Sequence, residues 1–442
     1  MRINHLIIKN FKGFKDNEFL FHPQFNLIVG ANGTGKTSLL DALSVAMGSW
    51  FLGFKGYDTR NIKPYEVLLK RFDLKDLKKS DCGHSDSYWE YQYPCSVEAF
   101  GKAQGKELSW MRTRNTAKGR TTHADAAKIK ELAEKMDKTV RSGGDAILPL
   151  IAYYGTGRLW NEPREQAQVK DEKNIARKET LSRLSAYRNC IDPRLSVSEL
   201  TRWIVRQSWI SYQKGSQSSL FKAVLGAIVN CVEGAHNLYF DADFYEVIVN
   251  MSELGNQPFN NLSDGQRCMF AMVGDIAQKA ATLNPHMRSE VLKKTPGVVL
   301  IDELDIHLHP KWQRRVIDDL RRTFPKIQFF ATTHSPFLIQ ALCSGEELIM
   351  LDGQPAAQLA NKPLEEIVQG IMGVSDPQVS MRYQEMKSKA KHYLETLEQA
   401  AQAPEDKLAE FKEKLAQTIG PYADNPAFQA FLEMKRSAKL GE

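Results

Sequence analysis

The chain has 442 residues, a formal net charge of +6, 42% apolar residues and 25% charged residues. These values are ordinary for a soluble globular protein and leave room for one large domain or two of ordinary size. They exclude a membrane-spanning protein, because no apolar run approaches the roughly 20 residues that cross a bilayer, and they permit a nucleic-acid partner without requiring one.

The N-terminal segment and the cysteines both favour a cytoplasmic location. The opening residues, MRINHLIIKNFKGF, contain no apolar signal-peptide region followed by a small-residue cleavage site. The cysteines show no metal-ligand spacing, so we expect reduced thiols in structural positions. They are Cys82, Cys95, Cys190, Cys231, Cys268 and Cys343.

The stretch NLIVGANGTGKTSLLDAL, residues 26–43, predicts a strand, a glycine loop and a helix within the first part of the core, residues 1–50. Its segment GANGTGKT fits the pattern G-x-x-x-x-G-K-[ST] in the strand–loop–helix context that this pattern requires. Glycines let backbone N–H groups point inward, and the helix N-terminus adds partial positive charge. We therefore expect a nucleoside triphosphate site, in which Lys36 reaches the β- and γ-phosphates and Thr37 is a ligand of Mg²⁺. The expected nucleotide-binding residues are Gly30, Asn32, Gly33, Gly35, Lys36, Thr37 and Ser38.

Residues 51–146 are expected to form an insertion. The stretch YPCSVEAFGKAQGKELSWMRTRN alternates and turns like a β-hairpin, and HADAAKIKELAEKMDKTV is typical of a helix. Basic residues surround Trp110, and two interpretations fit them: a nucleic-acid contact with a stacking ring, or a solvated hairpin face. These basic residues are Lys102, Lys106, Arg112, Arg114, Lys118 and Arg120.

After a core strand at 147–157, we expect a mainly helical lobe over 158–262, followed by the returning core at 263–355. The stretch NNLSDGQRCMFAM lies where the lobe ends. Ser263 can cap the helix that follows, and Gly265 would let the backbone approach a phosphate closely. A helix N-terminus with a serine and a glycine is a second anion site, and Gln266 lies in its first turn.

Two further strands carry polar residues at their ends. VVLIDELD, residues 298–305, predicts a buried strand that delivers Asp302 and Glu303 to the carboxyl edge of a parallel sheet. There Asp302 would hold Mg²⁺, and Glu303 would polarise the attacking water. IQFFATTHSPFL, residues 327–338, predicts a neighbouring strand that ends beside His334, within reach of a γ-phosphate.

These motifs together resemble those of the ABC-type ATPases. GANGTGKT resembles Walker A, VVLIDE resembles Walker B, LSDGQ is similar to the LSGGQ signature, and His334 falls at the switch histidine. INHLIIKNFKGF is similar to the opening of the RecF and SMC-like branch, with Lys12 at its basic position, and the resemblance implies that Lys12 binds the nucleotide. HLHP, residues 307–310, is typical of stand-alone ATPases in that branch, with His309 at the position of the D-loop aspartate.

The segment before the lobe departs from the family pattern. It has no clear Q-loop glutamine, and Gly155, Thr156 and Arg158 occupy that region. Two roles fit Arg158: it contacts phosphate, or it couples the lobes.

The resemblance implies an α/β fold. Its centre would be an ABC-type P-loop NTPase core, a mixed or parallel sheet flanked by helices, to which are added a hairpin and helix insertion, a helical lobe and a helical tail. It also implies ATP and Mg²⁺ as cofactors, with Glu303 and His334 in catalysis. A head-to-tail dimer would form, in which Ser263 and Gly265 of one subunit close over the γ-phosphate held by the other.

A helical tail is expected over residues 364–442. It has Leu408, Phe411, Leu415 and Ile419 at helical spacing, followed by PYADNPAFQAFLEM. These apolar side chains must be buried, either against the chain's own core or by a partner.

The compact layout is similar to the PtuA family of Septu ATPases from bacterial anti-phage systems. That resemblance implies an HNH nuclease partner docked on the tail. Two alternatives remain: a RecF-like repair clamp that binds DNA, and an AriA-like scaffold ATPase that holds a toxic effector.

Overall fold

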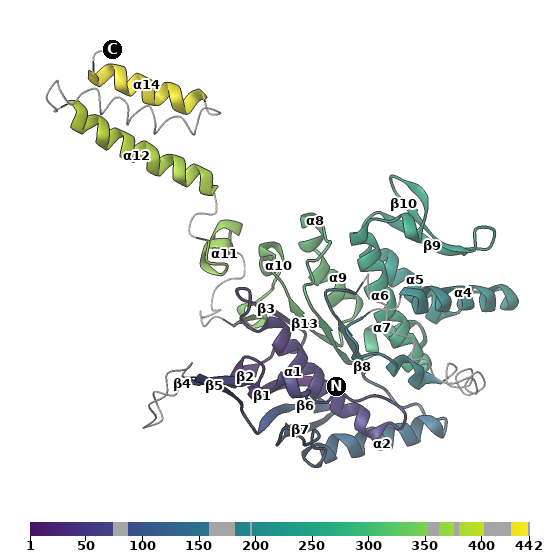
Figure 1. Cartoon of the computed structure of the whole chain (residues 1–442). Helices are drawn as coiled ribbons and strands as arrows, with labels where there is room; N and C mark the ends of the chain where they lie inside the picture. Colours follow the sequence, from purple (N-terminus) through teal and green to yellow (C-terminus); the bar gives the residue numbers. More distant parts are fainter. Residues whose placement is uncertain are drawn as a thin grey trace. The chain divides into compact units, whose positions relative to one another are not determined.

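A parallel five-stranded sheet, in the order β14-β3-β13-β12-β8, lies at the centre of the body, Met1–Ile367 (Figure 1). Strands β3, β8, β12 and β13 are buried along their whole length, which explains their continuous apolar sequences. The strands are β3 (Phe25–Val29), β8 (Leu150–Tyr154), β12 (Gly297–Ile301), β13 (Ile327–Thr332) and β14 (Leu348–Met350). The structure, a computed structural model, describes residues 1–73, 87–158, 182–194, 197–351, 362–374, 380–401 and 426–440.

The expected hairpin exists, but it does not belong to a separate insertion. Strands β6 and β7 join β1 and β2 in one antiparallel sheet, ordered β2-β1-β6-β7. The side chain of Gln328 in β13 connects this sheet to the parallel one, since it accepts from Ile3 N–H at 2.9 Å and donates to Ile3 O at 2.8 Å. The strands are β1 (Arg2–Phe11), β2 (Phe14–Leu20), β6 (Cys95–Ala103) and β7 (Lys106–Arg114).

Helix α1 (Lys36–Gly48) lies between the two sheets and contacts strands of both. This position explains why α1 is apolar on nearly all sides. Trp110 of β7 packs on α1, where its indole N–H donates to Ala46 O at 2.9 Å.

At the centre of the hairpin, burial contradicts both interpretations of the basic residues around Trp110. Trp110, Arg112 and Arg114 are buried, so they neither stack on a nucleic acid nor form a solvated face. The side chain of Arg112 donates to Thr122 O at 3.0 Å and to the side chains of Thr59 and Asn61 at 3.1 and 2.7 Å. Burial lowers the pKa of Arg112 to about 10, so it stays charged at neutral pH. Four expected basic residues remain exposed: Lys102, Lys106, Lys118 and Arg120.

The lobe is less helical than expected. Residues 235–258 form a three-stranded antiparallel sheet, because this stretch is rich in β-branched and aromatic residues. Its strands are β9 (Ala235–Asp241), β10 (Glu246–Met251) and β11 (Gly255–Pro258). The long helices of the lobe and signature are α4 (Val197–Lys214), α5 (Ser219–Cys231) and α6 (Asp264–Leu283).

Shorter elements complete the body. The helix expected near 123–140 is present as α2 (Ala127–Arg141), and a two-stranded ribbon pairs β4 (Leu69–Asp73) with β5 (Ser87–Tyr91). The remaining α-helices are α7 (Val291–Lys294), α8 (Pro310–Gln313), α9 (Val316–Thr323), α10 (Pro336–Gln340) and α11 (Leu364–Gly370), whose last residues lie beyond the body. The 3-10 helices are Ser49–Gly53, Pro64–Glu66, Ala124–Ala126, Arg183–Tyr187, Phe259–Asn261, Pro285–Glu290 and Gly345–Glu347.

A second unit spans Val368–Glu442 and contains α12 (Met381–Ala401) and α14 (Pro426–Leu440). Tyr393 and Leu397 of α12 pack with Leu432 of α14, and each of the three is 1% exposed. Within the described residues, no helix has the length and apolar character needed to cross a membrane. The tail residues Leu408, Phe411, Leu415, Ile419 and Tyr422 lie outside the described part of the chain.

Candidate active site

The glycine loop leads from β3 into α1 through backbone that favours glycine. Gly33 and Gly35 have φ of +85° and +104°, and a side chain on Gly35 would press against the ring of Phe14. The Lys36 ammonium lies at the mouth of this loop and donates to Gly30 O at 2.7 Å and to Ala31 O at 3.0 Å. The geometry thus gathers backbone N–H groups and one ammonium at the N-terminus of α1, which suits a phosphate chain.

The other residues of the glycine loop lie at or near the protein surface. Asn32 and Gly33 are exposed, and Ser38 is half-buried in the first turn of α1. All expected loop residues therefore lie within one strand–loop–helix unit.

The Thr37 hydroxyl meets the end of β12, two strands away from β3. It donates to the Asp302 carboxylate at 3.0 Å, and the other carboxylate oxygen accepts from the Thr332 hydroxyl at 2.6 Å. In the part of the chain that the structure describes, no group of three or more His, Cys, Asp or Glu side chains could hold a metal ion. One hydroxyl and one carboxylate nevertheless fit Mg²⁺, which commonly takes one or two protein ligands and completes its shell with phosphate oxygens and water.

Glu303 has a strained backbone, with φ of +50°. Its N–H donates to the Thr332 hydroxyl at 2.7 Å, and its carbonyl accepts from Arg158 Nη2 at 3.0 Å. Left-handed backbone at a residue other than glycine costs on the order of 1–3 kcal/mol and persists only where neighbours enforce it. Thr332 and Arg158 enforce it here, so the direction of the Glu303 side chain depends on both.

Arg158 lies behind this turn and is 1% exposed. Besides Glu303, its guanidinium donates to Asp302 O at 2.8 Å, Gly155 O at 3.2 Å and Cys268 Sγ at 3.1 Å. These contacts do not fit the alternative in which Arg158 contacts phosphate. They connect the end of β12 with α6, and the alternative in which Arg158 couples the lobes stays a prediction.

A second contact joins β8 to the same helix. The Tyr154 hydroxyl donates to the Asp275 carboxylate at 2.6 Å, and Asp275 also pairs with Lys279. Burial, followed by the nearby Asp275 carboxylate, raises the pKa of Tyr154 well above its usual value. Tyr154 therefore remains a hydrogen-bond donor that fixes α6 to the sheet.

Ser263 caps α6 as expected. Its hydroxyl accepts from Gln266 N–H at 3.4 Å, and the Gln266 side chain accepts from Ser263 N–H at 3.0 Å, which makes a reciprocal capping box. Ser263 is exposed at this helix N-terminus.

The structure explains the glycine at position 265 by a steric requirement, which differs from the expected close approach of the backbone to phosphate. A Cβ at this position would overlap His307 O. Gly265 is therefore required because α6 begins against the loop that follows β12.

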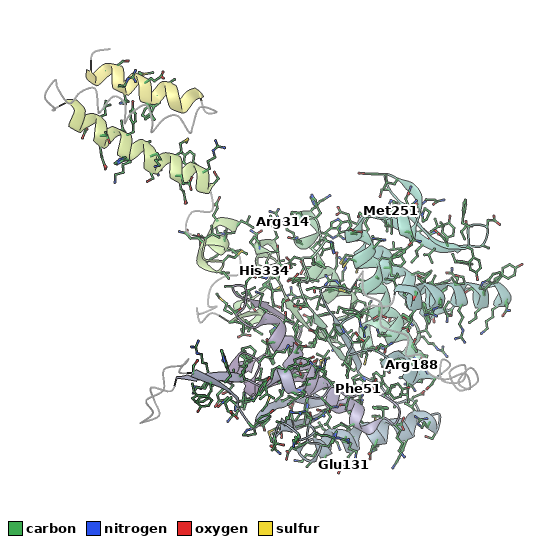
Figure 2. All side chains as sticks on the ribbon, viewed as in Figure 1. Phe51, Glu131, Arg188, Met251, Arg314 and His334 are labelled. Carbon is green, nitrogen blue, oxygen red and sulfur yellow. The ribbon has the colours of Figure 1, made fainter. Side chains whose placement is uncertain are left out.

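His334 follows β13 and is exposed; the residue is labelled in Figure 2. Its backbone N–H donates to the Asp305 carboxylate at 3.4 Å, and the Thr333 hydroxyl donates to the same oxygen at 2.6 Å. Asp305 was not among the expected site residues. A signal for it is present in the sequence, because Asp305 lies two residues after Glu303 in the same acidic strand end.

Lys12 lies at the turn between β1 and β2, with φ of +49°. Its ammonium forms an ion pair with Asp41 of α1, and Arg60 lies 3.6 Å from the same carboxylate. The expected nucleotide-binding role of Lys12 thus has a competing structural role in holding the β1–β2 turn to α1.

Two protein-family models match the chain. One, described as an AAA domain, matches residues 5–211, and the other, described as an AAA domain, putative AbiEii toxin, type IV TA system, matches residues 161–340. These matches agree with the parallel sheet and with the meeting of the glycine loop and Asp302. The chain resembles the ABC-type ATPases of the RecF and SMC-like branch.

Named relatives are similar to most of the chain. "Septu protein PtuA" of Bacillus thuringiensis is 22% identical over 86% of the chain and 86% of that protein, and its namesake in Bacillus mycoides is 26% identical over 80% of the chain. The chain spans only 41% of the Bacillus mycoides protein. "Retron Vc95 probable ATPase" of Vibrio cholerae is 21% identical over 78% of the chain and 72% of that protein.

More distant similarities are short or weak. "DNA replication and repair protein RecF" of Desulforamulus reducens is 39% identical, but only over 14% of the chain and 17% of that protein. Among solved structures, the SMC head domain from Thermotoga maritima matches with a TM-score of 0.40 and 14% identity, over 79% of the chain and 94% of that domain.

Proposed function

We propose that this ATPase is a subunit of a cytoplasmic bacterial anti-phage defence complex, in which it dimerises around ATP and regulates an associated HNH nuclease. The observation that carries the ATPase part is the convergence of Thr37, Asp302 and Glu303 at the ends of β3 and β12. The defence part rests on similarity to the two PtuA proteins over 80% and 86% of the chain.

Each site residue has a distinct role in this proposal. Lys36 would bind the β- and γ-phosphates, and Thr37 with Asp302 would hold Mg²⁺, which neutralises charge on the phosphates. Glu303 would polarise the attacking water, since its side chain follows the strained turn beside Asp302. His334 would contact the γ-phosphate from the neighbouring strand end.

A composite site would require two subunits. Ser263 is exposed at the N-terminus of the long helix α6, where partial positive charge suits an anion. In a head-to-tail dimer, Ser263 of one subunit would close over the γ-phosphate that the other subunit holds.

Ser263→Arg tests the composite site, because it blocks the helix end without touching the glycine loop. We expect normal ATP affinity but no ATP-driven dimer in light scattering. Ser218→Arg is the matched control, since Ser218 is also an exposed helix cap, accepting from Phe221 N–H at 3.1 Å. Dimerisation of Ser263→Arg at wild-type levels would refute the composite site.

The tail is the proposed docking surface for the nuclease. Its described helices bury one small cluster around Tyr393 and leave Tyr383, Phe431 and Met434 exposed by 48%, 45% and 69%. Exposed apolar side chains of this size favour a protein partner.

The deciding experiment is purification of the tagged full-length chain from cells that express its neighbouring genes, followed by identification of the co-eluting proteins. A stoichiometric HNH protein would support the proposal. A protein that elutes alone with and without ATP would refute the complex, and a different effector would favour an AriA-like scaffold.

Phe431→Ser with Met434→Ser would then localise the interface. We expect this double variant to lose the nuclease and keep its ATPase rate. Tyr212→Ser is the control, because Tyr212 is 82% exposed on α4 in the body. Retention of the nuclease by the double variant would exclude the α14 surface.

A RecF-like DNA clamp is the second candidate, favoured by the short RecF similarity noted above. It differs in one measurable property. Strong ATP-dependent DNA binding by the chain alone, without a nuclease, would favour the clamp.

A further inference from the structure

We propose that Asp305 is a positioning residue for His334, fixing the backbone from which the switch imidazole extends. The inference rests on the proposed function, because it assumes that His334 acts on the γ-phosphate. It assigns a task to a carboxylate that is neither a nucleotide nor a metal ligand in that proposal.

The first observation is a shared hydrogen-bond acceptor. One oxygen of the half-buried Asp305 carboxylate accepts from the Thr333 hydroxyl at 2.6 Å and from His334 N–H at 3.4 Å. The contact therefore reaches the main chain of His334 itself, whereas the imidazole remains exposed.

A second set of contacts closes a ring around this carboxylate. Ser335 N–H donates to the Thr333 hydroxyl at 2.8 Å, and the Ser335 hydroxyl donates to the Gln313 side-chain oxygen at 2.6 Å. The Gln313 amide donates to Leu308 O at 2.8 Å and to Asp305 O at 3.4 Å. Residues 333–335 are thus held at both ends by the loop that follows Glu303.

This ring connects the switch to the rest of the catalytic machinery. The segment from Asp305 to Gln313, which ends in the short helix α8, contains His307, against which the first turn of α6 packs at Gly265. It also begins two residues after the strained Glu303. A conformational change in the first turn of α6 or at Glu303 would reach His334 through Asp305.

The Asp305 carboxylate constrains the conformation of the backbone at Thr333 and His334. Loss of the acceptor would leave the Thr333 hydroxyl and His334 N–H free to turn away. A displacement on the order of 1 Å at a reacting group can cost about 100-fold in rate. We expect Asp305→Ala to lower kcat by about 10- to 100-fold, with little change in KM for ATP.

The test compares Asp305→Ala with Asp305→Asn in the full-length chain. The asparagine side-chain oxygen can accept both hydrogen bonds, so Asp305→Asn should recover most of the lost rate. Asp318→Ala is the control, because Asp318 is an exposed carboxylate on α9. In a His334→Ala background, Asp305→Ala should add less than about a two-fold further loss, because both changes remove one function.

Hydrogen exchange of the segment 333–335 gives a readout that does not depend on catalysis. Asp305→Ala should lose amide protection there, and Asp305→Asn should keep it. Unchanged protection, or a full additional rate loss in the His334→Ala background, would overturn the proposal. If the wild-type chain hydrolyses no ATP, the proposed function fails, but exchange still decides whether Asp305 positions the switch.

Discussion

Two regions of the body each bury an arginine, and they use it differently. At the nucleotide edge, meaning the carboxyl ends of β3, β12 and β13, Arg158 is 1% exposed; in the hairpin β6–β7, Arg112 is 0% exposed. Both donate to carbonyls and to uncharged side chains. Arg158 holds the carbonyl of a strained residue, Glu303, whereas the partners of Arg112 have ordinary backbone angles. The same buried chemistry thus supports the strained turn at Glu303 in one region and only the ordinary fold in the other.

The two largest expected effects come from the nucleotide edge. Lys36→Ala removes the only lysine of the glycine loop, and loss of a charge contact of this kind costs roughly 2–5 kcal/mol, or at least about 30-fold in Kd for ATP. Lys106→Ala is the hairpin counterpart, because Lys106 is exposed at the start of β7 and should leave the Kd unchanged. Fluorescent-nucleotide titration measures the Kd of both variants. If the two variants bind ATP with equal affinity, the glycine loop is not part of the nucleotide site.

Glu303→Gln should lower kcat by about 100- to 10,000-fold, as expected for loss of a group that activates water. ATP binding should persist because Asp302 and Thr37 are unchanged, so this variant should accumulate the ATP-bound dimer. Glu107→Gln in the hairpin is the control with an exposed carboxylate. Steady-state hydrolysis at the wild-type rate would show that Glu303 is not the catalytic residue.

The two arginines give the sharpest comparison. Arg158→Met and Arg112→Met each leave buried carbonyls without donors, so each should lower the free energy of unfolding by about 1–3 kcal/mol. Only Arg158→Met should also lower kcat, by about 10- to 100-fold, because Glu303 can then leave its strained conformation. Denaturant unfolding and kcat are measured below both melting transitions. Equal kcat values for the two variants would break the distinction between the regions.

The smallest expected effect concerns two glycines that each lie against a backbone carbonyl. A Cβ on Gly265 would overlap His307 O, and a Cβ on Gly101 of β6 would overlap Arg2 O. Both alanine variants should be destabilised by about 1–3 kcal/mol through overpacking. Only Gly265→Ala should reduce the ATPase rate of the folded protein, since its loop leads to Asp305 and the switch. A parallel rate loss in Gly101→Ala would assign the effect to stability alone.

Prediction from sequence succeeded where the signal is contiguous. The glycine loop lies between β3 and α1 as expected, Asp302 follows β12, His334 follows β13, and Ser263 caps α6. It failed where apolar and basic residues alternate. Trp110 and Arg112 share a pattern with exposed hairpins, but α1 and the 59–61 loop cover them. The lobe sheet at 235–258 was missed because β-propensity depends strongly on tertiary context.

The sequence by itself determined the nucleotide motifs and the strand ends that carry them, because both depend on local backbone geometry and on spacing along the chain. Only the tertiary structure decided that Arg158 holds the carbonyls of Asp302 and Glu303, that Asp305 binds the switch, and that Gly265 lies against His307. These contacts join residues that are tens to more than a hundred positions apart. Their partners are mostly backbone groups, which every residue possesses, so no sequence pattern distinguishes the pairs before the sheet brings them together.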